Sequence, residues 1–67
     1  MELTTRNQIK GTVTSVITGT VMAEVKVDVG GKEFVAAVTR HSVERLGLEK
    51  GDNVTVLIKA TEVMLAK

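Results

Sequence analysis

Basic residues lie beside hydroxyl-bearing residues at two distant points of the sequence. The first stretch, TTRNQIKG near the N-terminus, places Arg6 directly after Thr4 and Thr5. The second stretch, LIKATEV near the C-terminus, places Lys59 two residues before Thr61. A small dianion needs convergent N–H and O–H donors, with one or two positive charges to offset its lost hydration. These residue types can form such a site if the fold brings the two stretches together.

Further donors lie close to these residues or at the start of a helix. The backbone N–H groups of Ala60 and Thr61 follow Lys59 directly, and Ser42 lies at or near an expected helix start, where unpaired N–H groups favour negative charge. Each group also has an ordinary interpretation. The threonines can be chain terminus, Arg6 and Lys59 solvated strand ends, and Ser42 a plain helix cap. The residues alone leave both interpretations open.

Catalysis is not expected from this set of side chains. His41 is the one histidine and there is no cysteine, so neither a zinc site nor an activated nucleophile has the partners it requires. The acidic residues are scattered among lysines and arginines, which is typical of solubilising surface charge. We therefore expect no enzyme activity and no resident cofactor or metal.

The composition favours a small domain that associates with itself. We expect one domain over residues 1–67, and 43% of these residues are apolar. A domain of this size buries only about 60% of its unfolded surface. Without disulfides or a structural metal, oligomerisation is the remaining way to stabilise it. The sequence therefore predicts a homo-oligomer.

Charge and composition argue against nucleic acid and membranes as partners. Nine basic and eight acidic residues give a formal net charge of +1, and Phe34 is the one aromatic residue. Nucleic-acid binding rests on many cation–phosphate contacts and on rings that stack with bases. No apolar run approaches the roughly 20 residues that span a bilayer, and the first residues are polar. We expect a soluble protein of the cytoplasm.

Alternation with a period of two predicts strands over most of the chain. The clearest strand covers Val21–Val29, and a Gly-Gly turn then leads to a second alternating run over Lys32–Thr39. An earlier strand covers about Asn7–Ile17. Its alternation slips between Val13 and Val16, which predicts a bulge or sharp bend there.

The last third of the sequence predicts a short helix and two more strands. The helix ends at Gly47, with Thr39 or Ser42 as its N-cap. The strands cover Asn53–Lys59 and Thr61–Ala66. Five strands with a short helix between the third and fourth indicate an all-β, OB-like barrel, although another small five-stranded barrel would fit the same pattern.

Two motifs resemble a known family. The stretch TTRNQIKG is similar to the S-x-R-N-Q-x-x-G opening of the Mop domain, also called the TOBE domain. VTRHSVERLGLEKGDNVTVLIKATEVMLAK is similar to its closing half. The resemblance spans Thr4 to Lys67 and points to the molbindins, small cytoplasmic molybdate-binding proteins. The same domain occurs in molybdate-responsive regulators and in molybdate transporter ATPases.

The resemblance implies an OB-like barrel that assembles into a hexamer, as a trimer of dimers, with oxyanion sites shared between subunits. The family usually has serine and then alanine where this chain has two threonines, so it stays open which threonine contacts the anion. The candidate oxyanion-binding residues are Thr4, Thr5, Arg6, Ser42, Lys59, Ala60 and Thr61.

The implied function is storage of molybdate or tungstate without a catalytic step. Both are fully deprotonated dianions at neutral pH, and no candidate ligand is a carboxylate, so every ligand can donate. The alternative is an oligomerising regulatory or sensor module with a secondary anion site. Tight binding without another protein favours storage, whereas weak binding with a co-purifying partner favours the module.

Overall fold

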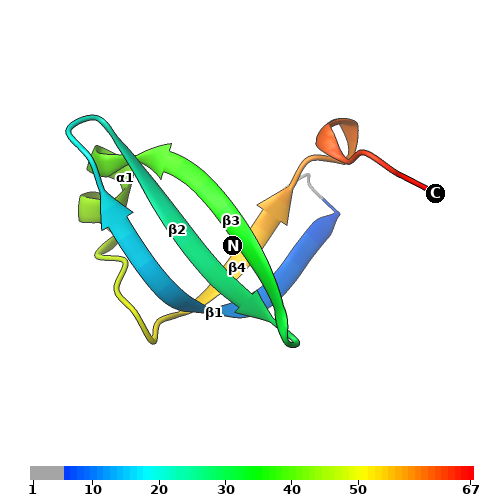
Figure 1. Cartoon of the computed structure of the whole chain (residues 1–67), viewed down its shortest axis with the longest axis horizontal. Coiled ribbons are helices and arrows are strands. Elements are labelled where there is room, and N and C mark those ends of the chain that lie inside the picture. Colours follow the sequence, from blue (N-terminus) through cyan, green and yellow to red (C-terminus); the bar gives the residue numbers. More distant parts are fainter. Residues whose placement is uncertain (1–5) are drawn as a thin grey trace.

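Four antiparallel strands form one curved sheet in the order β3-β2-β1-β4 (Figure 1). The computed structural model describes residues 6–67. It is mostly β, with one short α-helix between β3 and β4, as the sequence predicts. The elements in chain order are β1 (Asn7–Thr18), β2 (Met22–Val29), β3 (Lys32–Thr39), α1 (Arg40–Leu46), β4 (Asn53–Ile58) and the 3-10 helix η1 (Ala60–Glu62).

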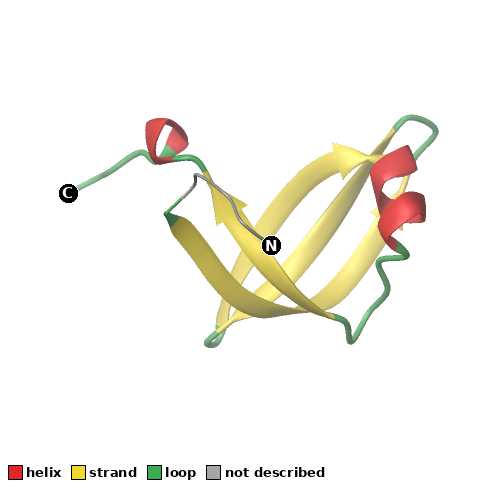
Figure 2. Cartoon of the chain, turned by 180° about the vertical axis from the view of Figure 1, so that it is seen from behind, coloured by secondary structure: helices red, strands yellow, loops and turns green. Residues whose placement is uncertain are grey.

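The fifth strand expected over Thr61–Ala66 is wrong for this chain taken alone. Residues 60–62 form η1 instead, and no strand follows in residues 63–67. A strand needs a neighbouring strand to pair its N–H and C=O groups. Beyond β4 the chain leads away from the sheet and meets no such neighbour (Figure 2). The sheet is therefore open, and the expected barrel closure is absent from the described part.

The long strand β1 lies between β2 and β4, and its pairing with β2 contains an irregularity. Asn7 to Thr12 pair with β4, and Thr12 to Thr18 pair with β2. The register on β2 shifts between Val13 and Ser15, inside the interval where the alternation slips. A bulge of this kind bends its strand and increases the local twist. The predicted bulge is confirmed, and it lies where β1 passes from one partner to the other.

The core is built mainly from the alternating face of β2. The buried side chains in the described part all belong to small aliphatic residues. They are Val13, Ala23, Val25, Val27 and Val43. Val43 comes from α1, which lies across one end of the sheet (Figure 2). The three members on β2 lie on the face that the period-two pattern predicts, whereas Val21, at the start of the predicted strand, precedes β2 and is 69% exposed.

The structure shows which of the two expected residues, Thr39 or Ser42, is the N-cap of α1. Thr39 is the cap, because its Oγ1 accepts a hydrogen bond of 3.1 Å from the N–H of Ser42. Gly47 ends the helix at a φ of 62°, in the left-handed region that favours glycine, and its N–H donates to the carbonyl of Glu44. The helix stop at Gly47 is confirmed.

Gly11 of β1 packs tightly against β2, and a larger residue would clash there. A Cβ atom on Gly11 would lie 2.6 Å from a side-chain carbon of Val27 and 2.8 Å from the carbonyl oxygen of Asp28. The second contact is with backbone, so a larger residue can be accommodated only if the strands separate. This glycine allows β1 to pair with β4 while passing close over β2.

We expect Gly11→Ala to lower the free energy of unfolding by about 1–3 kcal/mol, the usual cost of overpacking a tight contact. Urea denaturation would measure the change. Thr12→Ser, at the next position of β1 where the side chain is exposed, is the matched control and should have little effect. A stability of Gly11→Ala equal to that of the parent would show that the close approach is not required.

Candidate functional site

The pairing of β1 with β4 brings the two basic stretches to one end of the sheet. Asn7 and Ile58 form the last pair of this ladder, although 51 positions separate them in sequence. Arg6 precedes the first member of that pair and Lys59 follows the second. Because the strands are antiparallel, Arg6 and Lys59 leave the sheet at the same place. The structure thus brings together two predicted site residues.

A side-chain hydrogen bond closes this end of the ladder. The Nδ2 atom of half-buried Asn7 donates to the carbonyl oxygen of Ile58 at 3.0 Å. The bond fixes the direction in which the chain enters β1 and leaves β4, and so it positions the residues on either side. Our sequence reasoning gave Asn7 no role. The sequence feature that could have marked Asn7 is its position directly after Arg6, within the R-N-Q motif.

Lys59 turns the chain from β4 into η1 and leaves backbone donors available beside its own side chain. Its backbone is extended, with φ −64° and ψ 136°, and its carbonyl accepts from the N–H of Glu62 at 2.9 Å. Within residues 6–67, the N–H groups of Ala60 and Thr61 make no hydrogen bond. One exposed ammonium group and two unpaired N–H groups therefore lie in three consecutive residues.

The charges of Arg6 and Lys59 are not neutralised within the described part of the chain. Both residues are exposed, and neither forms an ion pair with any of residues 6–67. The two ion pairs found there join other residues, the closer being Arg40 Nε with Glu44 at 2.8 Å. The end of the sheet at Arg6 and Lys59 can therefore attract an anion.

The other predicted ligands do not join this cluster. Thr4 and Thr5 lie outside the described residues. Ser42 lies in α1, which follows β3 at the opposite end of the sheet, where Thr39 pairs with Met22. Its hydroxyl oxygen accepts a bond of 2.7 Å from the Thr39 hydroxyl, and its N–H is used by the same cap. Within one chain, Ser42 cannot act together with Arg6.

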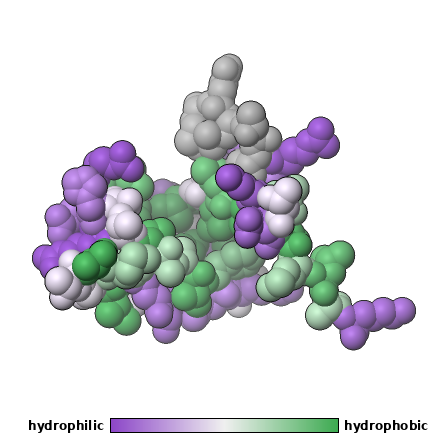
Figure 3. Space-filling model, turned by 90° about the horizontal axis from the view of Figure 1, so that it is seen from above, coloured by the Kyte–Doolittle hydropathy of each residue, from purple (hydrophilic) through white to green (hydrophobic). Residues whose placement is uncertain are grey.

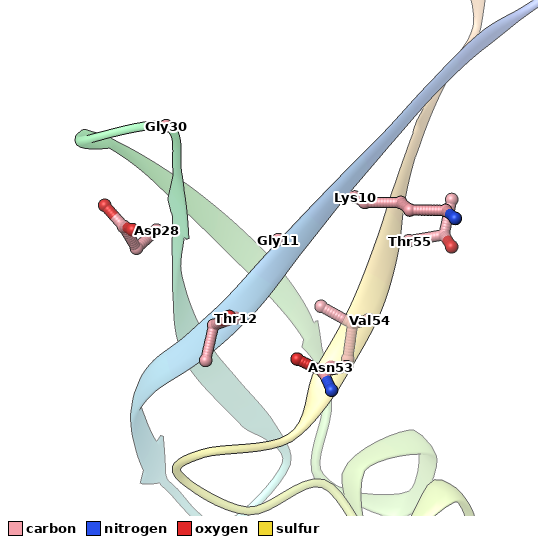
Figure 4. Close-up of a pocket in the computed structure, with 8 residues that line it drawn as sticks. All are labelled: Lys10, Gly11, Thr12, Asp28, Gly30, Asn53, Val54 and Thr55. Carbon is pink, nitrogen blue, oxygen red and sulfur yellow. The ribbon is translucent and has the colours of Figure 1, made fainter.

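A hollow on another part of the sheet is a weaker candidate, because its polar groups do not converge (Figure 4). Lys10 and Thr55 are cross-strand neighbours and lie on one side of β1, whereas Asp28 points away on the other side. The lining residues are Lys10, Gly11, Thr12, Asp28, Gly30, Asn53, Val54 and Thr55. This arrangement cannot surround a small ligand with donors.

Neither a metal cluster nor a membrane helix is found in residues 6–67. No group of three or more histidine, cysteine, aspartate or glutamate side chains is placed to hold a metal ion there. Over the same residues, no helix has the length and apolar character needed to cross a membrane. His41, the one histidine, is exposed on α1.

Comparison with known proteins identifies the class of domain. The family model of the TOBE domain matches residues 3–65. The chain belongs to the TOBE-domain family, which confirms the resemblance carried by its two motifs.

Several proteins similar to this chain are named for binding molybdate or molybdenum. A molybdate binding protein from Sporomusa ovata has the same fold, with a TM-score of 0.97, 46% identity and full coverage of both chains. MopII from Clostridium pasteurianum superposes with a TM-score of 0.93 at 36% identity, over 98% of this chain and 100% of that one. A probable molybdenum-pterin-binding protein of Haemophilus influenzae is 41% identical over 97% of this chain and 96% of its own length.

We expect Asn7→Ala to loosen the end of the β1–β4 ladder without unfolding the rest. Losing one partly buried hydrogen bond should cost about 1 kcal/mol. Amide hydrogen exchange should then accelerate at Gln8 and Ile58 and stay unchanged at Val25 in the core. Thr14→Ala, which removes a longer and exposed bond of 3.3 Å to the carbonyl of Lys26, is the control. Unchanged exchange at Gln8 and Ile58 would show that Asn7 does not hold this end.

Proposed function

We propose that the chain binds molybdate or tungstate, as the intact oxyanion, at the end of the sheet where β1 begins and β4 ends. The observation that supports this proposal is the β1–β4 register, whose last pair, Asn7 with Ile58, is flanked by Arg6 and Lys59, and the N–H groups of Ala60 and Thr61 follow directly. The relatives named for molybdate and molybdenum binding support the choice of anion.

The chemistry of the proposed ligands suits a dianion that can only accept hydrogen bonds. The planar guanidinium of Arg6 offers five donors, and the ammonium of Lys59 adds a second positive charge. The backbone N–H groups of Ala60 and Thr61 add two uncharged donors. Micromolar affinity corresponds to about 8 kcal/mol. A few charge-assisted hydrogen bonds, each worth about 1.5–3 kcal/mol, supply this.

The complete site is shared between subunits of a homo-oligomer in this proposal. Ser42 lies at the far end of its own sheet, so it reaches the anion bound by Arg6 and Lys59 only from another copy. The hexamer implied by the sequence resemblance offers such contacts, and the five-stranded barrel belongs to this assembly. Thr4 or Thr5 supplies the remaining hydroxyl.

Such a protein stores its ligand in the cytoplasm and performs no reaction on it. The anion enters and leaves by mass action, so the bound fraction follows the free molybdate concentration. The proposed ligands offer donors and charge, and none is a base placed to activate a nucleophile. Binding, rather than catalysis, is what these residues can do.

We expect Arg6→Ala and Lys59→Ala each to weaken molybdate binding by about 10- to 100-fold, because each removes a charge-assisted hydrogen bond worth about 1.5–3 kcal/mol. Isothermal titration calorimetry with molybdate would measure this, and tungstate should behave alike. Both side chains are exposed, so the fold should persist.

Lys32→Ala and Lys50→Ala are the matched controls, because both remove an exposed cation at a residue outside the proposed site. They should leave the affinity almost unchanged. Equal affinity in the Arg6 and Lys59 variants and in these controls would mean that the anion binds elsewhere. A separate titration with a pterin lacking molybdenum would show whether a pterin, rather than the oxyanion, is the ligand.

A further inference from the structure

The exposed face of the β1–β4 ladder carries no carboxylate. Exposed side chains on these two strands alternate with half-buried residues that face the core. Directly opposed residues of an antiparallel pair lie on the same face of the sheet. The exposed pairs are Gln8 with Leu57, Lys10 with Thr55, and Thr12 with Asn53. We call these six residues the outer face of the ladder, and Lys10 is its one charged member.

Two more cations extend the positive charge of the outer face toward the proposed anion site. Arg6 directly precedes β1, and Lys59 directly follows β4. The backbone of Lys59 is still extended, so the alternation from Leu57 continues through it onto the same face. Lys10 is exposed and, like Arg6 and Lys59, forms no ion pair with any of residues 6–67.

The acidic residues nearest to the outer face lie at its other end. Asp28 of β2 pairs with Thr12, and Asp52 directly precedes β4. The carboxylate of Asp52 is held by the N–H of Glu49 at 2.9 Å. In Figure 4, Lys10 lies beside Thr55 on one side of β1, whereas Asp28 points away on the other side. Charge along the ladder therefore changes from negative at one end to positive at the end that bears the proposed site.

The rest of the described chain does little to offset this charge or to cover the outer face. Glu62 in η1 is the one acidic side chain that follows β4, and it forms no ion pair with Arg6 or Lys59. Residues 63–67 lead away from the ladder and project at the right of Figures 1 and 3. Within residues 6–67, the outer face is open to a solute.

We propose that the outer face attracts the oxyanion toward Arg6 and Lys59, and that Lys10 extends the positive potential along the sheet. This inference rests on the proposed function. Surfaces lined by charge of one sign raise the local concentration of a ligand of opposite charge. Four residues separate Lys10 from Arg6, which is about 13 Å along an extended strand. Lys10 therefore acts through its charge at a distance and is not a ligand of the bound anion.

Action at a distance has a dependence on salt that direct contact lacks. The screening length in water is about 30 Å at 0.01 M ionic strength and falls to about 3 Å at 1 M. A charge about 13 Å away is thus felt in dilute buffer and is screened in concentrated salt. A charge in contact with the anion keeps most of its effect, because few salt ions enter between the two.

The test compares two substitutions of Lys10 at two salt concentrations, with molybdate as the probe in isothermal titration calorimetry. At about 10 mM ionic strength we expect Lys10→Gln to weaken binding about twofold and Lys10→Glu about fourfold. At about 0.5 M both should differ from the parent by less than about 1.5-fold. Arg6→Ala should keep most of its loss at both concentrations. Lys10 is exposed, so these variants should fold.

Two control variants separate the position of the charge from other effects. Lys10→Arg keeps the charge and should retain the parent affinity at both salt concentrations. Lys32→Glu makes the same change in net charge on β3, the edge strand opposite β4, and should alter the affinity much less than Lys10→Glu. An equal loss in Lys32→Glu would show that net charge alone matters. A loss in Lys10→Glu that persists at high salt would make Lys10 a ligand, and no loss at low salt would remove its role; each result overturns the proposal.

The outcomes for the two proposals can be told apart. If Arg6→Ala weakens binding while Lys10→Glu has no salt-dependent effect, attraction by the outer face is wrong and the anion site stands. If Lys10→Glu weakens binding only at low salt while Arg6→Ala and Lys59→Ala leave the affinity unchanged, the outer face still attracts the anion and the proposed ligands are wrong.

Discussion

The pairing of β1 with β4 is the constraint on which the candidate site depends. These two strands come from opposite ends of the sequence, and their ladder ends in the pair of Asn7 with Ile58, held by the Asn7 side chain at 3.0 Å. Closing so long a loop costs conformational entropy, which grows slowly with loop length. The pairing must be stabilised by the sheet as a whole, so the site forms only where the fold is complete.

The strand β1 is irregular near the point where its two ladders meet. As an inner strand it pairs with β4 on one edge over Asn7 to Thr12 and with β2 on the other edge over Thr12 to Thr18. The bulge between Val13 and Ser15 bends it, and Gly11 lets it pass within contact distance of β2 while it pairs with Val54 of β4. The two features occupy neighbouring positions and act together. Both features therefore lie near the point where the β1–β4 ladder ends and the β1–β2 ladder begins.

Local patterns in the sequence predicted the parts of the fold that local physics decides. The alternation over Val21–Val29, the slip after Val13 and the glycine at position 47 each reflect one strand or one helix end, and each matched the structure. The proximity of Arg6 and Lys59 could not be read in this way, because register between distant strands depends on how the whole sheet packs. The sequence could mark both residues as anion ligands without showing that they meet.

The predicted fifth strand shows what an alternating pattern means physically. Alternation says that a segment can pair with a strand edge and bury one face; it does not say which edge. Residues 63–67 form no strand and pair with neither edge strand of their own sheet, β3 or β4. Ser42 is in a similar position, since it is a plausible ligand that lies at the wrong end of its own sheet. The described residues bury five side chains, all of them valine or alanine. The sequence therefore shows what each of these segments can pair with or bind, whereas its partner depends on contacts between distant residues that no local pattern encodes.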